Sequence, residues 1–135
     1  MLFSLCFICP LNSFAQPYVK RGIDVSYHNG IINWQAVKSD NIDFAILRTS
    51  FGWSNRQKFT DQQLINNING TRNVGMPIGA YHYSYATTPH EALMEADFFL
   101  ARLEWATWEY PVYMDFEDKC QMRLSKQQKT DLIRT

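Results

Sequence analysis

The sequence predicts an α/β protein in which short strands alternate with helices and lie parallel in one sheet. Two observations support this prediction. Short apolar runs alternate along the chain with segments whose apolar residues recur at helical spacing. The run at 44–49 is nearly continuous in apolar residues, which is typical of parallel strands covered on both faces. Alternation of this kind favours a parallel sheet with right-handed crossovers.

Four predicted strands carry this pattern, and they cover residues 22–26, 44–49, 78–85 and 111–117. Together with the helices they make four βα units, which fit either an open doubly wound sheet or part of a (β/α) barrel. A complete barrel needs about 200 or more residues, and this chain has 135. No Gly-x-Gly-x-x-Gly follows the first predicted strand, so the sequence does not support a dinucleotide site.

The predicted helices follow the strands and cover residues 34–39, 61–74, 89–103 and 126–135. The third has the clearest start, because Thr88 can cap it, Pro89 takes the first helical position and Glu91 can reach back to the cap. Thr60 and Gln63 can form a similar capping box for the second helix.

The composition restricts the class of protein. The chain is 46% hydrophobic and 15% aromatic, so we expect a folded domain, and its aromatic side chains suit either a filled core or a carbohydrate site. Formal net charge is zero, without a basic stripe, so nucleic acid is not an expected partner. Cys120 is the only cysteine beyond residue 16, so we expect no internal disulfide.

Residues 1–16 are a predicted signal peptide. They contain an apolar core at 2–8 and the small residues Ser13 and Ala15 before the expected cleavage site, although no Lys or Arg precedes the core. The segment is too short to span a membrane as a helix. We therefore expect a secreted or periplasmic location and a domain covering residues 17–135.

The clearest candidate catalytic residues lie at the end of the fourth predicted strand. Asp115 and Glu117 are spaced i, i+2, so on a strand both would point to one face with their Cα atoms about 6.6 Å apart. Neighbouring carboxylates resist ionising together, so one can keep a proton and serve as an acid. The alternative is a strand end that passes into a polar loop, in which Asp118 is only a solvated charge.

The other predicted strands also carry polar and aromatic residues toward their carboxyl ends, where parallel α/β folds place their chemistry. Their convergence predicts a site at this edge of the sheet. His82, between two tyrosines, points to the opposite face from them and fits either a core histidine or a direct role. Trp53 lies in a polar loop and is a candidate sugar platform. The residues at the other strand ends are Asp24, Tyr27, His28, Arg48, Thr49, Tyr81, Tyr83 and Tyr85.

Several segments together resemble the family 25 glycoside hydrolases, which are lysozymes that cut peptidoglycan. The most characteristic is 74–84, Val-Gly-Met-Pro-Ile-Gly-Ala-Tyr-His-Tyr-Ser. Others are 22–26, 27–30, 32–34, 42–48, the spaced residues Asp61, Leu64 and Asn67, the run 96–100, and Asp115-Phe116-Glu117. The resemblance implies the N-terminal half of a TIM-like barrel. In it, 17–135 is an incomplete catalytic domain, and an inactive relative or a non-catalytic glycan-binding protein is an alternative.

The resemblance also implies a reaction: hydrolysis of the β-1,4 bond between N-acetylmuramic acid and N-acetylglucosamine, with peptidoglycan glycan strands as the partner. Glu117 corresponds to the general acid, Asp115 to its partner and Asp24 to a third acidic residue of the site. Whether the reaction retains or inverts configuration stays open. No cofactor or metal is implied, and no ligand spacing supports a metal-dependent deacetylase built on Asp24, His82 and Asp115. The implied substrate-binding residues are Tyr81, Tyr83, Trp53 and Tyr27.

Overall fold

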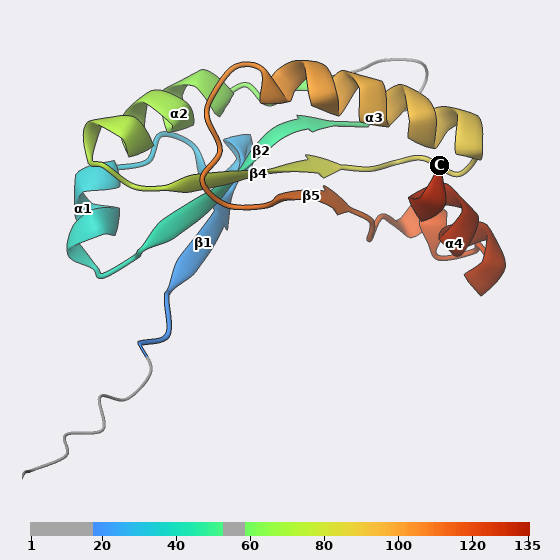
Figure 1. The fold of residues 1–135 in the computed structure, drawn as a ribbon, viewed down its shortest axis with the longest axis horizontal. Coiled ribbons are helices and arrows are strands. Elements are labelled where there is room, and N and C mark those ends of the chain that lie inside the picture. Colours follow the sequence, from blue (N-terminus) through green and yellow to red (C-terminus); the bar gives the residue numbers. More distant parts are fainter. Residues whose placement is uncertain (1–17, 53–58) are drawn as a thin grey trace, which may run out of the picture.

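The computed structural model describes residues 18–52 and 59–135. The predicted signal peptide and Trp53 lie outside these residues. Within them, the chain forms one five-stranded sheet (Figure 1). The parallel strands lie in the order β1-β2-β4-β5, and the short β3 pairs antiparallel with the end of β2. The strands are β1 (Gly22–Val25), β2 (Phe44–Phe51), β3 (Phe59–Thr60), β4 (Ile78–Tyr83) and β5 (Val112–Asp115).

Three helices, α1, α2 and α3, lie along one face of the sheet, and α4 lies beyond the end of β5 (Figure 1). We call the face that these three helices cover the helix face, and the opposite one the pocket face. In the part of the chain that the structure describes, no helix covers the pocket face. The helices are α1 (Trp34–Ser39), α2 (Leu64–Asn73), α3 (Pro89–Leu103) and α4 (Lys126–Arg134), with short 3-10 turns η1 (Tyr27–Asn29) and η3 (Lys119–Gln121).

The core lies between the sheet and α1 and α2. Leu47 of β2, Ile78 of β4 and Leu64 of α2 are fully buried there. On β2 these helix-facing side chains alternate with Ile46 and Arg48, which point to the pocket face. The alternation allows one strand to supply both the core and the pocket. The predicted α/β class with parallel strands is therefore confirmed.

Two predicted boundaries were wrong. The second helix begins at Leu64 because Thr60 belongs to β3, and the Asp61 carboxylate, instead of a capping box, accepts the Gln63 N–H at 2.9 Å. The fourth strand ends at Asp115, two residues before the predicted end. Beyond it, the chain turns into η3, which Asp118 caps.

A β-bulge interrupts β2 at Thr49. Arg48 pairs with Tyr81 and Ser50 pairs with His82, so Thr49 is skipped in the register with β4. The extra residue puts Arg48 on the pocket face and Ser50 on the helix face, although strict alternation would put both on one face.

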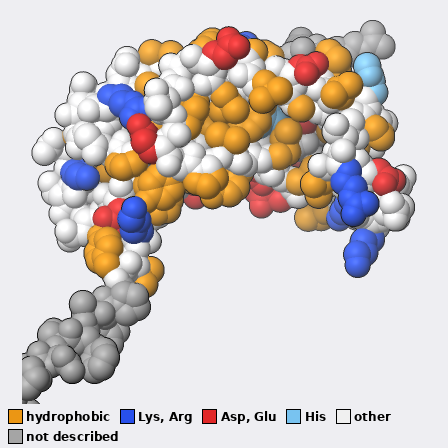
Figure 2. Space-filling view, in the orientation of Figure 1, with side chains coloured by type: hydrophobic (Ala, Val, Ile, Leu, Met, Phe, Trp, Pro, Cys, Tyr) orange, Lys and Arg blue, Asp and Glu red, His pale blue; other side chains and the backbone are white. Residues whose placement is uncertain are grey.

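Exposed apolar side chains remain on the outer side of α3 and on β5, where Leu100 is 60% and Val112 43% exposed. Figure 2 shows hydrophobic side chains across the middle of this view. A search of the described residues finds no helix with the length and apolar character needed to cross a membrane.

Candidate active site

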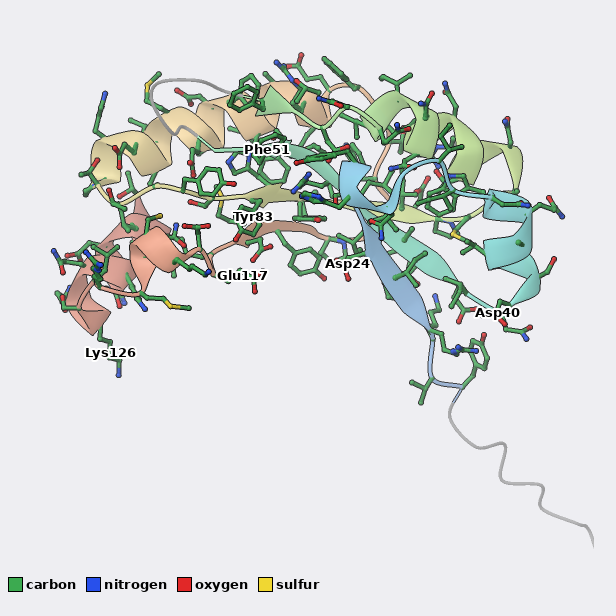
Figure 3. The ribbon with its side chains drawn as sticks, turned by 180° about the vertical axis from the view of Figure 1, so that it is seen from behind. Asp24, Asp40, Phe51, Tyr83, Glu117 and Lys126 are labelled. Atoms are coloured by element: carbon green, nitrogen blue, oxygen red, sulfur yellow. The ribbon has the colours of Figure 1, made fainter. Side chains whose placement is uncertain are left out.

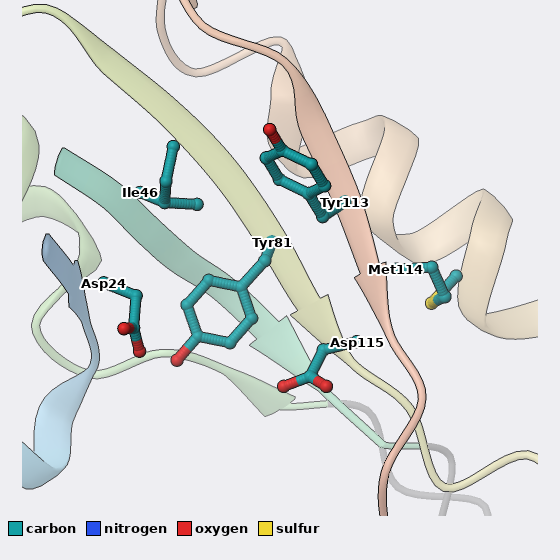
Figure 4. Close-up of a pocket in the computed structure, with 6 residues that line it drawn as sticks. All are labelled: Asp24, Ile46, Tyr81, Tyr113, Met114 and Asp115. Atoms are coloured by element: carbon teal, nitrogen blue, oxygen red, sulfur yellow. The ribbon is translucent and has the colours of Figure 1, made fainter. Parts of the chain in front are cut away.

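A pocket of about 330 Å³ opens on the pocket face (Figure 4). The strand register explains why its polar side chains converge: Asp24 pairs with Ile46 and Tyr81 with Tyr113, and Asp115, paired with Tyr83, lies on the same face. The sequence predicted that Asp24, Tyr81 and Asp115 converge, and the structure brings all three together. The lining residues are Asp24, Ile46, Tyr81, Tyr113, Met114 and Asp115.

Tyr81 lies between the two acidic residues of the pocket. Figure 4 shows its ring between Asp24 and Asp115, with its hydroxyl on the same side as both carboxylates. Burial raises the pKa of Tyr81, and the charges of Asp24 and Asp115 raise it further, whereas Arg48 lowers it. The phenol therefore keeps its proton at neutral pH and can donate a hydrogen bond to a ligand.

Asp115 has a perturbed pKa. Burial raises the pKa of this carboxyl, and the nearby charges of Glu117 and Asp24 add to the rise, whereas Arg48 opposes it. The neighbouring carboxylates therefore make Asp115 hold its proton more strongly than an isolated aspartate. The raised pKa falls on Asp115.

Glu117 lies outside the strand. Because β5 ends at Asp115, strand alternation does not place Glu117, and the predicted same-strand geometry was wrong. Figure 3 nevertheless shows Asp24, Tyr83 and Glu117 on the uncovered side of the sheet. The turn after β5 therefore presents Glu117 toward the side that Asp24 occupies.

A buried ion pair supports the pocket from β2. The Arg48 Nε lies 2.8 Å from Asp61 Oδ2, and the side chains are 7% and 0% exposed. The same Asp61 oxygen accepts the backbone N–H of Tyr27 at 3.0 Å, and the guanidinium stacks on the Tyr27 and Phe51 rings. Tyr27, a predicted substrate-binding residue, is therefore held by this pair. The sequence indicated Asp61 only as part of the family pattern.

Tyr83 contacts the segment that follows β5. Its hydroxyl donates to Asp118 Oδ2 at 3.3 Å. Burial raises the pKa of Tyr83 to about 12, with Asp118 and Glu117 adding to the rise. Asp118 also accepts the Cys120 N–H at 2.9 Å, so it is a capping residue, and its interpretation as a solvated charge was wrong.

His82 lies on the helix face and is fully buried. Its Nδ1 is 2.8 Å from Ser50 Oγ, and its Nε2 is 3.5 Å from Glu95 Oε2 of α3. It is a core histidine on the opposite face from Asp24 and Asp115, so the three cannot share a metal. Across residues 18–52 and 59–135, no group of three or more His, Cys, Asp or Glu side chains has the arrangement of a metal site.

The comparisons with known proteins match most of the chain. A family model described as glycosyl hydrolases family 25 matches residues 23–135. Lysozyme M1 from Streptomyces globisporus is 33% identical over 79 residues, which cover 58% of this chain and 25% of that protein.

Solved structures are similar over more of the chain. The autolysin LytC from Streptococcus pneumoniae is 25% identical, with a TM-score of 0.71, and the match covers 85% of this chain and 28% of LytC. LytC has also been solved with a synthetic peptidoglycan ligand. A bacterial lysozyme from Streptomyces coelicolor is 25% identical, with a TM-score of 0.65 over 88% of this chain and 56% of that protein. The chain thus spans between about a quarter and about half of these proteins, and their fold confirms the predicted half of a TIM-like barrel.

Proposed function

The chain belongs to family 25 of the glycosyl hydrolases, and from this premise we propose that it acts in the hydrolysis of peptidoglycan. The bond cleaved is the β-1,4 bond between N-acetylmuramic acid and N-acetylglucosamine, a lysozyme (muramidase) activity. The observation that carries the proposal is the pocket in which Asp24 and Asp115, from the two outer strands of the parallel sheet, lie on either side of Tyr81. The substrate is a cell-wall polymer, so the proposed location is secreted or periplasmic.

The proposed reaction divides the acids by role. The glycosidic oxygen is a poor leaving group, so Glu117 donates a proton to it in the transition state. Positive charge then develops on the sugar, and the carboxylates of Asp24 and Asp115 stabilise it. Because the pKa of Asp115 is raised, this stabilisation requires a pH at which Asp115 has lost its proton.

The tyrosines are proposed to bind the substrate. The raised pKa of Tyr81 leaves it a neutral hydroxyl donor beside Asp24 and Asp115, whereas Tyr83, whose hydroxyl donates to Asp118, offers its oxygen as an acceptor and its ring. Tyr27, held by Asp61 and stacked with Arg48, offers its ring at the end of β1. Trp53 keeps its proposed role as a sugar platform, on the strength of its place in a polar loop.

The test is clearance of a peptidoglycan suspension, with analysis of which sugar carries the new reducing end. Glu117→Gln is expected to lower the rate at least about 100-fold, the usual contribution of general acid catalysis. Glu104→Gln, at the end of α3, is the matched control and should hydrolyse at the wild-type rate. The anomeric form of the first product distinguishes retention from inversion. Peptidoglycan binding without hydrolysis by the wild-type chain would overturn the proposal in favour of a glycan-binding protein.

A further inference from the structure

Glu117 sits in a segment without strand pairing. Among the described residues, its side chain makes no hydrogen bond or ion pair. Its position is therefore set by the backbone on either side of it, which runs from the end of β5 at Asp115 to the cap of η3 at Asp118. An acid that must reach a glycosidic oxygen needs a defined position, so the contacts of this short segment decide where Glu117 points.

One side chain holds the far end of the segment. Gln121 is only 2% exposed, although glutamine usually lies at the surface. Its Oε1 accepts the backbone N–H of Asp118 at 3.1 Å. Its Nε2 lies 3.2 Å from the Ser84 carbonyl and 3.1 Å from the Ala86 carbonyl, and it also contacts the Ser84 hydroxyl at 3.2 Å. Gln121 thus joins the residue after Glu117 to the loop that follows β4.

The near end of the segment is tied to the same loop. The Ser84 N–H donates to the Asp115 carbonyl at 2.9 Å. Glu117 therefore lies between two attachment points, Asp115 and Asp118, and both lead to residues directly after Tyr83. The Tyr83 hydroxyl adds a weaker contact to Asp118. Figure 3 shows Glu117 close to Tyr83 on the uncovered side of the sheet.

We propose that Gln121 is a positioning residue for Glu117, holding the segment after β5 against the loop after β4 so that the Glu117 carboxylate stays beside the pocket. This inference rests on the proposed function, in which Glu117 is the acid. Gln121 itself does not reach the pocket and takes no part in the chemistry. Its two ends serve different purposes: the oxygen holds the Asp118 N–H, and the nitrogen holds the loop carbonyls.

The experiment uses Gln121→Met, which keeps the length of the side chain and removes its hydrogen bonds. The first measurement is the ionisation of Asp115, followed by NMR of its carboxyl carbon. Glu117 and Asp24 raise the pKa of Asp115 and Arg48 lowers it. Tyr81, Tyr83 and Tyr113 also face it, and the raised pKa values of Tyr81 and Tyr83 keep these two neutral over the titration. If Glu117 moves away from the pocket, the pKa of Asp115 falls below the wild-type value.

The second measurement is the backbone relaxation of residues 116–118, which is expected to show faster local motion in Gln121→Met than in the wild-type chain. Gln128→Met is the matched control, because Gln128 also accepts a capping-box N–H, from Ser125 at 2.9 Å, but lies on α4 away from the pocket. It should leave the Asp115 titration unchanged. If Gln121→Met does not fold, Ser84→Ala, which removes one partner of the amide, should shift both measurements in the same direction by less.

Hydrolysis separates the two proposals. With an active wild-type chain, Gln121→Met is expected to lower kcat about 10- to 100-fold at unchanged KM, the effect of a misplaced acid. If Gln121→Met alters both NMR measurements but the wild-type chain does not hydrolyse peptidoglycan, the proposed function is refuted and the positioning role of Gln121 is supported. An unchanged Asp115 titration and unchanged relaxation in the folded variant would refute the positioning whatever the activity.

Discussion

The buried ion pair between Arg48 and Asp61 should contribute strongly to stability, and substituting Asp61 tests this. Asp61→Ala removes the charge partner of Arg48, a residue that is only 6% exposed. It also removes the acceptor of two backbone N–H groups, those of Tyr27 and Gln63. One terminal nitrogen of Arg48 is already buried without a partner, so the loss leaves a poorly solvated cation.

The expected cost follows from these contacts. Breaking a buried pair on one side destabilises a protein by about 3–5 kcal/mol, because the remaining charge stays buried. A domain of this kind has a total stability of about 5–15 kcal/mol, so Asp61→Ala should consume a large part of it. Replacing both residues, as in Arg48→Met with Asp61→Leu, removes the unpaired charge and should cost at least about 2 kcal/mol less than the two single changes added together.

The assay is urea unfolding, with linear extrapolation to water, of Asp61→Ala and of the four proteins of the cycle, which are the wild type, Arg48→Met, Asp61→Leu and the double variant. Arg72→Met is the comparison, because its partner Glu109 is 38% exposed and the pair at the surface should contribute only about 0–1 kcal/mol. A coupling energy below about 0.5 kcal/mol in the cycle would refute the reasoning, since it would mean that Arg48 and Asp61 act independently.

Two further predictions concern the pocket and the sheet. The folded-state pKa of Asp115 is raised, so its contribution to stability is full below the unfolded pKa of about 3.9 and is lost as pH rises through the folded value. Asp115→Asn should therefore be more stable than the wild type at pH 7, by a margin that shrinks toward pH 4 in urea melts; a margin independent of pH would contradict this. At Gly79, a Cβ would lie 2.5 Å from the Pro111 carbonyl oxygen, so Gly79→Ala should push β5 from β4 and cost about 1–3 kcal/mol by thermal unfolding. An unchanged melting temperature would show that the two strands can separate at little cost.

The parallel sheet and part of the candidate site could be predicted from the sequence. Asp24, Tyr81 and Asp115 could be brought together from sequence because predicted parallel strands carry all three, and such strands deliver their side chains to one edge. The predicted position of Glu117 failed because it assumed that β5 continues, whereas the chain turns to let Asp118 cap η3.

The supporting residues could not be found in the same way. Asp61 acts through partners 13 and 34 positions away in the chain, and Gln121 through partners up to 37 positions away. Neither residue lies on a strand, and no local pattern distinguishes a buried glutamine or aspartate from an exposed one. The polar atoms of Asp61 and Gln121 are seen to be buried, and their hydrogen-bond partners are identified, only once the fold brings distant loops together.

The unpaired residue in β2 affects how sequences of related chains should be aligned. Downstream of Thr49, the facing of Ser50 and Phe51 is set by their partners on β4, His82 and Tyr83. A homologue without a residue at Thr49 would form an uninterrupted ladder between β2 and β4, and Ser50 and Phe51 would keep their present faces. A deletion elsewhere in β2 would instead move the residues after it to the opposite face of the sheet. We therefore expect length variation in this strand at Thr49, and alignments should place it there.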